Sequence, residues 1–185
     1  MKTTSLFLLA SLLLATSCGQ DAASKEAEAR VTASIQQLLG SGNPTYINVL
    51  HTWYQSDVPN LIKLNPKTES IYRTHAEILQ EASTQEPKLV QHKIVTNAQA
   101  QGIRSMYKKL VDESAANVQE LSALATSKTS MSEAEQLKYV SDLADKEQHQ
   151  LALVKYYGKK TAYTIAQKEQ QATNKRLMMQ MWGHE

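Results

Sequence analysis

Apolar residues recur every three or four positions along most of the chain, which is the spacing of one face of an α-helix. The pattern is regular over residues 31–39 and stops at the glycine- and proline-containing segment 40–44. It returns over 66–81, 87–125 and 133–181. The frequent turns and the β-branched alternation that a β-sandwich needs are scarce. The pattern therefore predicts an all-α fold.

The two longest patterns are neighbours along the chain, separated by the polar segment 126–131. Ser132 and Glu135 have the spacing of a capping box, which favours the start of a helix. A short loop between two long helices predicts an antiparallel hairpin, here over residues 87–182. The apolar stripe of the second helix consists of Leu137, Val140, Ala144, Leu151, Val154, Gly158, Ala162 and Ile165.

Residues 31–86 are expected to form shorter helices packed on this hairpin, with a break at 83–87 that Pro87 closes. The stretch 46–64 has the highest density of apolar residues after the N-terminus, and Pro59 divides it into short helices. It contains Trp53 and Tyr54. The favoured interpretation of both is the core of a small subdomain. The alternative is a partner-binding surface, because aromatic residues often anchor interfaces.

The N-terminus has the order of a secretory signal: a lysine, an apolar run and then small residues that lead to Cys18. The apolar run is too short for a permanent membrane span. We predict a signal peptide over 1–17, a tether over 18–30 and a single helical domain over 31–185. The small residue before Cys18 resembles the bacterial lipobox, in which the cysteine carries lipid.

Cys18 is the chain's only cysteine, so no intramolecular disulfide is possible. We predict that lipid on Cys18 anchors the protein to a membrane of the cell envelope and that the protein lies in the periplasm. Each buried methylene of such a lipid contributes about 0.8 kcal/mol, and several chains suffice for stable anchoring. The alternative is cleavage at a nearby position and loss of Cys18 with the signal peptide.

Composition narrows the possible functions. The 185 residues carry a net charge of only +2, which does not indicate general or direct nucleic-acid binding. No phosphate-binding loop, nucleophile elbow or paired metal-ligand spacing occurs, so neither catalytic residues, nor a metal, nor a cofactor is predicted. The histidines are scattered and are expected to be surface or half-buried structural residues: His51, His75, His92, His149 and His184.

Two features of the last predicted helix favour contact with protein partners. Tyr156 and Tyr157 begin a stretch rich in lysine, which is a solvated face or a surface for an acidic partner or headgroup. The helix closes on 177–182, where methionines precede Trp182. Such a methionine-rich end either completes the bundle, which is the favoured interpretation, or adapts to a partner's groove.

From residue 110 onward the order of these features is similar to a known family. The residues that carry the likeness are Leu110–Ser114, Val118, Leu121, Thr129–Glu135, Val154–Lys160 and Lys175–Gly183. They resemble the TraI-type conjugal transfer proteins of Bacteroides-group conjugative transposons. Those proteins are similar to the TrbJ class and to minor pilus-tip subunits of type IV secretion systems.

The resemblance implies an exported, non-enzymatic helical component of a DNA-transfer apparatus, whose partners are secretion-channel or pilus subunits. Two features depart from the family pattern. The half of the chain around Trp53 has no counterpart, and a lipid on Cys18 does not suit a pilus subunit that leaves the membrane. An anchored assembly factor or exclusion protein fits both observations. The alternative function is an anchored binding module, such as an immunity or inhibitor protein.

Overall fold

The computed structural model describes residues 7–40, 43–126 and 131–183, and side chains from residue 22 onward except those of 125 and 126. All regular secondary structure among the described residues is helical, and no strand occurs in them, which confirms the all-α prediction. The elements are α1 (Phe7–Leu39), α2 (Pro44–Tyr54), α3 (Asn60–Lys63), α4 (Pro66–Val90), α5 (Asn97–Thr126) and α6 (Glu133–Trp182).

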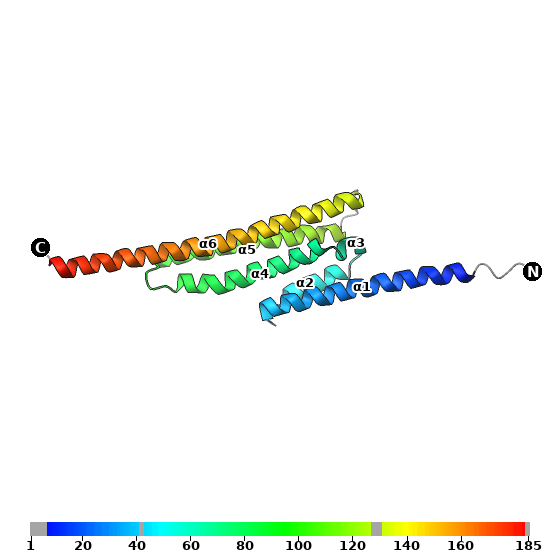
Figure 1. The fold of residues 1–185 in the computed structure, drawn as a ribbon, viewed down its shortest axis with the longest axis horizontal. Coiled ribbons are helices and arrows are strands. Elements are labelled where there is room, and N and C mark those ends of the chain that lie inside the picture. The colour runs from blue at the N-terminus through cyan, green and yellow to red at the C-terminus, as the bar shows by residue number, and fades with distance from the viewer. Residues whose placement is uncertain (1–6, 41–42, 127–130, 184–185) are drawn as a thin grey trace, which may run out of the picture.

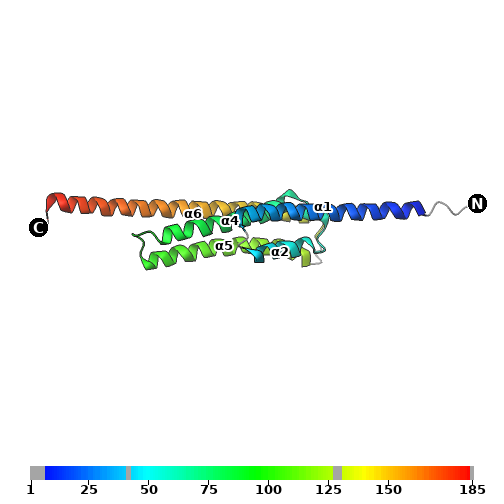
Figure 2. The ribbon, with the colours of Figure 1, turned by 90° about the horizontal axis from the view of Figure 1, so that it is seen from below.

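The helices form an elongated bundle in which α4, α5 and α6 lie side by side (Figures 1 and 2). α5 and α6 are the predicted antiparallel hairpin, and α4 runs in the same direction as α6. α1 and α2 cover one half of this three-helix body. The N-terminal end of α1 and the C-terminal end of α6 project from opposite ends of the molecule.

Capping residues explain where the two best-predicted helices begin. The side chain of Asn65 accepts a hydrogen bond from the backbone N–H of Lys67 at 2.8 Å, and Pro66 occupies the first turn of α4, where its missing N–H costs nothing. At the start of α6, the Ser132 hydroxyl accepts from the Glu135 N–H at 3.4 Å, and the Glu135 carboxylate accepts from the Ser132 N–H at 2.7 Å. The predicted capping box is confirmed.

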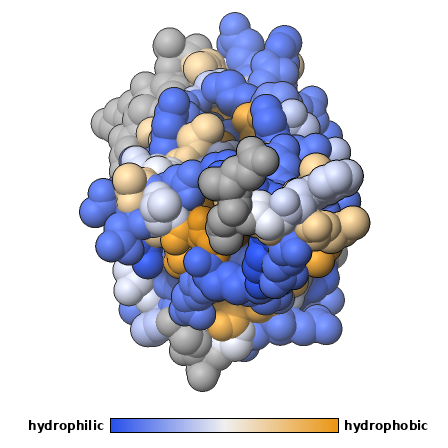
Figure 3. Space-filling model, turned by 90° about the vertical axis from the view of Figure 1, so that its left-hand side faces the viewer, coloured by the Kyte–Doolittle hydropathy of each residue, from blue (hydrophilic) through white to orange (hydrophobic). Residues whose placement is uncertain are grey.

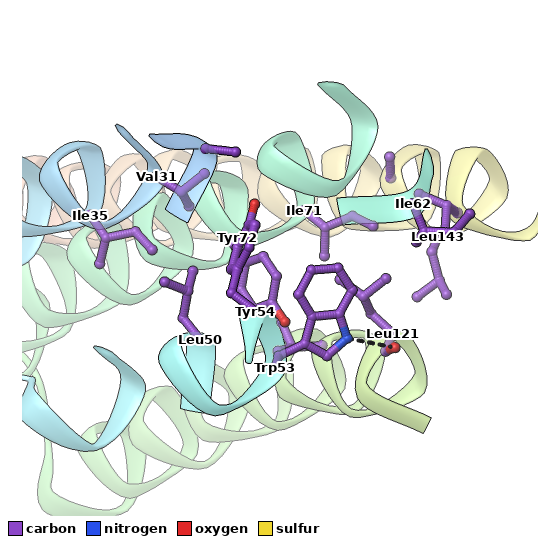
Figure 4. Close-up of a cluster of buried hydrophobic side chains, with 14 of the residues drawn as sticks. Val31, Ile35, Leu50, Trp53, Tyr54, Ile62, Ile71, Tyr72, Leu121 and Leu143 are labelled. Carbon is purple, nitrogen blue, oxygen red and sulfur yellow. Dashed lines mark hydrogen bonds between the residues drawn. The ribbon is translucent and has the colours of Figure 1, made fainter. Parts of the chain in front are cut away.

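The half of the bundle that α1 and α2 cover has an aromatic core, which we call the first core (Figure 4). Trp53 packs edge-on against Tyr54 and Tyr72, with ring centroids 5.1 and 5.6 Å apart. The Trp53 indole N–H donates to the backbone carbonyl of Leu121 in α5 at 3.3 Å. Trp53 thus joins α2, α4 and α5 in the interior.

The other half of the bundle has a second core, to which α4, α5 and α6 contribute. Its buried residues include Ile78 of α4, Tyr107 of α5 and Val154 of α6. α1 ends before this level, so the second half is thinner than the first (Figure 1).

A buried polar layer separates the two cores. Ser114 of α5 donates to the Glu147 carboxylate of α6, and His75 Nδ1 of α4 lies 2.6 Å from the Ser114 hydroxyl oxygen. The Asn117 amide donates to the other Glu147 oxygen at 2.7 Å. Ser114 and Glu147 are fully buried, and His75 is 5 % exposed. His75 is therefore an interior residue, which corrects the surface or half-buried position expected for it.

The break expected at 83–87 is wrong, because α4 continues through Pro87 to Val90. The chain turns instead over 91–96, and the domain division drawn at 86/87 falls inside α4. A proline inside a helix costs about 3 kcal/mol. Burial of Leu89 in the second core offsets part of that cost, because burying a leucine side chain contributes about 1.5–3 kcal/mol.

The segment expected to be a tether, 18–30, is helical and belongs to α1. Ser24 and Ala27 are buried, and Arg30 Nε lies 3.1 Å from the Glu69 carboxylate of α4. The packed part of α1 therefore begins before residue 31. Cys18 lies within the span of α1, but its side chain is outside the described residues, as are residues 1–6 and the side chains of the rest of the predicted signal peptide.

Candidate partner-binding site

A groove of about 680 Å³ lies between α5 and α6 on the surface of the second core. Its floor is apolar and includes Ile94 of the 91–96 turn, Ile103, Met106 and Leu110 of α5, and Leu153 and Ile165 of α6. Met106 and Leu153 remain 39 % and 36 % exposed, whereas Ile103, Leu110 and Ile165 are buried. The groove thus extends the second core to the surface, where no described helix covers it.

Charged side chains at the groove are mainly basic. The groove is lined by three lysines and one acid, which gives three positive charges against one negative charge. They are Lys109, Lys160, Lys168 and Glu113. Lys109 Nζ lies 3.9 Å from the Glu113 carboxylate. Lys160 Nζ lies 5.6 Å from the centre of the Tyr156 ring, a cation–π contact. Within the described part of the chain, neither Lys160 nor Lys168 forms an ion pair with an acid.

Next to the groove residue Tyr157, α5 and α6 pack closely at Gly158. The rings of Tyr107 and Tyr157 meet edge to face with centroids 5.3 Å apart. A Cβ atom on Gly158 would lie 2.8 Å from the Tyr107 hydroxyl oxygen, so an alanine there would require the Tyr107 side chain to shift. Burial raises the pKa of the Tyr107 hydroxyl to about 12, helped by the nearby charge of Glu81.

The C-terminal part of α6 leaves the bundle beyond Glu169. Lys93 Nζ lies 2.6 Å from one Glu169 oxygen and His92 Nε2 lies 3.5 Å from the other, so the 91–96 turn holds α6 at this level. These contacts, first the hydrogen bond from Lys93, lower the pKa of the Glu169 carboxyl.

Past Glu169 the helix exposes a cluster of apolar side chains, which we call the α6 end. It consists of Leu177, Met178, Met179, Met181 and Trp182, which are 45–76 % exposed. Figure 3 views the molecule from the end at which α6 projects, and it shows hydrophobic residues among hydrophilic ones. The expectation that 177–182 completes the bundle is wrong, because these side chains are exposed rather than packed in it.

The aromatic residues predicted as partner contacts occupy different places. Trp53 and Tyr54 are each 3 % exposed and belong to the first core, so they offer no surface to a partner. Tyr156 is 60 % exposed and, with the half-buried Tyr157, lines the groove. Trp182 is 76 % exposed and lies apart from the groove, on the α6 end.

Several groove residues were missed by the sequence analysis as candidates. Met106 and Ile94 belong to an apolar helical pattern, and such a pattern does not reveal whether another helix covers it. Gly102 is, in the sequence, only a helix-weakening residue, whereas it lies in the groove, where a Cβ atom would meet no neighbouring side chain within 4 Å. The lysine-rich stretch of α6 was the one feature of the sequence that indicated a binding surface at the groove.

The buried trio His75, Ser114 and Glu147 contains residue types used in catalysis, but their order does not suit it. A serine nucleophile needs a histidine between it and the carboxylate. Here Ser114 lies between the other two and directs its hydrogen to Glu147. The layer instead satisfies polar groups inside the bundle.

Within the described residues, no group of three or more His, Cys, Asp and Glu side chains is placed to hold a metal ion. None of the described helices has both the length and the apolar character needed to cross a membrane. Comparison of the chain with known protein families, with curated proteins and with solved structures finds no match.

Proposed function

We propose that this protein is an exported, lipid-anchored structural component of a conjugative type IV secretion apparatus, and that it acts through protein contacts. The observation that carries the proposal is the α6 end. This cluster closes the segment that resembles conjugal transfer proteins, and its apolar side chains are exposed. Exposed apolar clusters of this kind are typical of interaction sites.

The position of the two termini suits an anchored protein that reaches toward a partner. Removal of the predicted signal peptide 1–17 would make Cys18 the first residue of α1, and a lipid on it would hold that end of α1 at a membrane. The α6 end projects from the opposite end of the molecule (Figure 1). α6 alone has 50 residues, which corresponds to a length of about 75 Å at 1.5 Å per residue. The bundle would then act as a rigid spacer between the membrane and a secretion-channel or pilus subunit in the periplasm.

Gene deletion in a conjugative host tests this function, with transfer frequency as the measurement. Transfer should fall on deletion and recover when the full chain is supplied. A chain truncated after Gln170 keeps both cores but lacks the α6 end, and it should not restore transfer. Unchanged transfer in the deletion strain would refute the proposal.

The anchor is tested separately with Cys18→Ser. Membrane fractionation and transfer should be lost together if the lipid holds an assembly factor in place. A variant that fractionates and transfers normally would refute the lipid and favour a pilus subunit that leaves the membrane.

The alternative of an immunity or inhibitor protein rested on the export signal and on the aromatic residues around Trp53, and it has lost the second of these because Trp53 and Tyr54 are buried. The α6 end would serve such a protein equally well. Crosslinking from the α6 end in intact cells distinguishes the two functions. Secretion-channel subunits as the main products support the transfer function, and a toxin or lytic enzyme supports the alternative.

A further inference from the structure

The bundle around the α5–α6 groove lacks a helix that would cover its apolar surface. In the first half of the molecule, α1 and α2 pack on the three long helices and complete a core. In the second half, α4, α5 and α6 enclose the core, and Met106 and Leu153 remain partly exposed between α5 and α6. Two antiparallel helices that leave an apolar seam uncovered offer the position of a further helix.

The dimensions of the groove suit the apolar face of such a helix. Along α5 the lining runs from Gln99 to Glu113, and along α6 it runs from Leu153 to Lys168. At 1.5 Å per residue these spans are about 20 Å each, the length of roughly four helical turns. A volume of about 680 Å³ accommodates the side chains of one helical face, spaced as the i, i+3, i+4 and i+7 anchors of groove-bound helices.

The charged side chains at the groove determine which kind of helix can bind there. Lys109, Lys160 and Lys168 at the groove face one acid, Glu113, so an acidic helix is attracted and a basic helix is repelled. This argues against a second copy of the chain that inserts its α6 end, because Lys175 and Arg176 precede that cluster. Acidic residues that flank the apolar anchors would instead pair with Lys160 and Lys168.

We propose that the α5–α6 groove binds an acidic amphipathic helix of a partner protein, about 14 residues long. The anchors of this helix cover Met106 and Leu153, and its acidic flanks contact Lys160 and Lys168. The site does not depend on the transfer function, because it is defined by the chemistry of the groove alone.

Three synthetic 16-residue peptides test the proposal. They share leucines at i, i+3, i+4 and i+7 spacing and differ only at the flanking positions, which are all Glu, all Gln or all Lys. Binding to the full chain is measured by fluorescence anisotropy at low and at high salt. The Glu peptide should bind at least about 10-fold more tightly than the Lys peptide, and salt should reduce this difference because the lysines are solvent-exposed.

Charge reversal provides the matched comparison. Lys160→Glu combined with Lys168→Glu should invert the preference, so that the Lys peptide binds more tightly. Lys175→Glu combined with Arg176→Glu changes the same number of charges on α6 outside the groove, and it should keep the original preference. Equal binding of the three peptides to the unmodified chain, or an unchanged preference after reversal in the groove, would overturn the proposal.

Gly102 provides a test of position that does not threaten folding. A leucine at Gly102 extends into open space in the groove and should weaken Glu-peptide binding at least about 10-fold, whereas an alanine there should not. Equal effects of the two variants would place the peptide elsewhere.

Sodium oleate is assayed in parallel, and a chain that binds oleate but none of the peptides would make the groove a lipid site. A dimer that Gly102→Leu dissociates would make a second copy the occupant. Either result would refute the binding of a partner helix in the groove. Neither assay uses transfer frequency, so each tests this proposal separately from the proposed function.

Discussion

At the scale of single residues, the two glycines inside α5 and α6 have opposite surroundings. Replacing a helix-interior glycine with alanine generally stabilises a protein by about 0.5–1 kcal/mol. Gly102 has open space beside it, so Gly102→Ala should show this gain. At Gly158 the new methyl group would meet the Tyr107 hydroxyl oxygen at 2.8 Å, and the buried Tyr107 ring has little room to move.

We therefore expect Gly158→Ala to lower the free energy of unfolding by about 1–2 kcal/mol, because the cost of overpacking, about 1–3 kcal/mol, exceeds the gain in helix stability. Adding Tyr107→Phe should restore stability, because it removes the clashing hydroxyl, which has no hydrogen-bond partner among the described residues. Urea denaturation of the two single variants and the double variant measures the coupling. A stabilising Gly158→Ala would contradict the packing seen between α5 and α6.

Glu147 is the residue on which the polar layer depends. Removal of its carboxylate leaves the donors of Ser114 and Asn117 without their acceptor inside the bundle. Each buried donor left without an acceptor costs about 1–3 kcal/mol, so Glu147→Ala should be severely destabilising and Glu147→Gln less so. Asp142→Ala is the control on the same helix, because Asp142 pairs with Lys138 at the surface. A similar cost for Glu147→Ala and Asp142→Ala in urea denaturation would show that the layer contributes little.

At the scale of elements, local signals predicted most helices but misplaced one turn. The start of α6 followed from Ser132 with Glu135, and Asn65 and Pro66 are the local signal at the start of α4. The start of α5 had the same kind of signal, since Thr96 and Gln99 have capping-box spacing. In the structure the Gln99 N–H donates to the Thr96 hydroxyl at 3.3 Å, and the Thr96 N–H donates to the Gln99 side chain at 3.1 Å. Pro87 led to the wrong prediction of a break at 83–87, because prolines usually end helices, whereas α4 continues through it.

The two capping boxes should respond differently to acid. Hydrogen bonds from the Ser132 side chain and backbone lower the pKa of the Glu135 carboxyl below its ordinary 4.5. A lowered pKa in the folded state means that the stabilisation is present above the unfolded pKa and is lost as pH falls through the folded pKa. Gln99 does not titrate, so its box should persist in acid.

Thr96→Ala should lower stability by about 1 kcal/mol at neutral and at acidic pH. Ser132→Ala should be destabilising at neutral pH, and its effect should shrink as pH falls below about 4.5. Thermal denaturation of both variants from pH 7 to pH 3 provides the measurement, with each variant compared with the unmodified chain at the same pH. Parallel pH profiles for the two variants would contradict this account.

At the scale of the whole molecule, the sequence predicted that the helices assemble as a hairpin with shorter helices on it, but not how the interior is divided. The polar layer joins residues that are 33 and 39 positions apart, and no local pattern links His75, Ser114 and Glu147. The α5–α6 groove was not predicted because the apolar stripe of α5 is the same whether a helix covers it or not. Trp53 was assigned to a core or to a surface, and only its neighbours decide between them.

The three long helices pass through both cores, so the molecule should unfold as one unit at high pH. Burial raises the pKa of Tyr46, Tyr54 and Tyr72 in the first core and that of Tyr107 in the second. A raised pKa in the folded state means that the stability is present below the ordinary tyrosine pKa of 10 and is lost as pH rises through the folded pKa.

We expect helicity, measured by circular dichroism at 222 nm, to persist to about pH 10 and then to fall in a single transition. Tyrosinate absorbance at 295 nm from the buried residues should rise in the same transition. Tyr72→Phe should move the transition to higher pH, because the variant has one fewer buried hydroxyl to ionise. Tyr163→Phe, at a side chain that is 65 % exposed, should leave it in place. Two separate transitions would show instead that the first and second cores unfold independently.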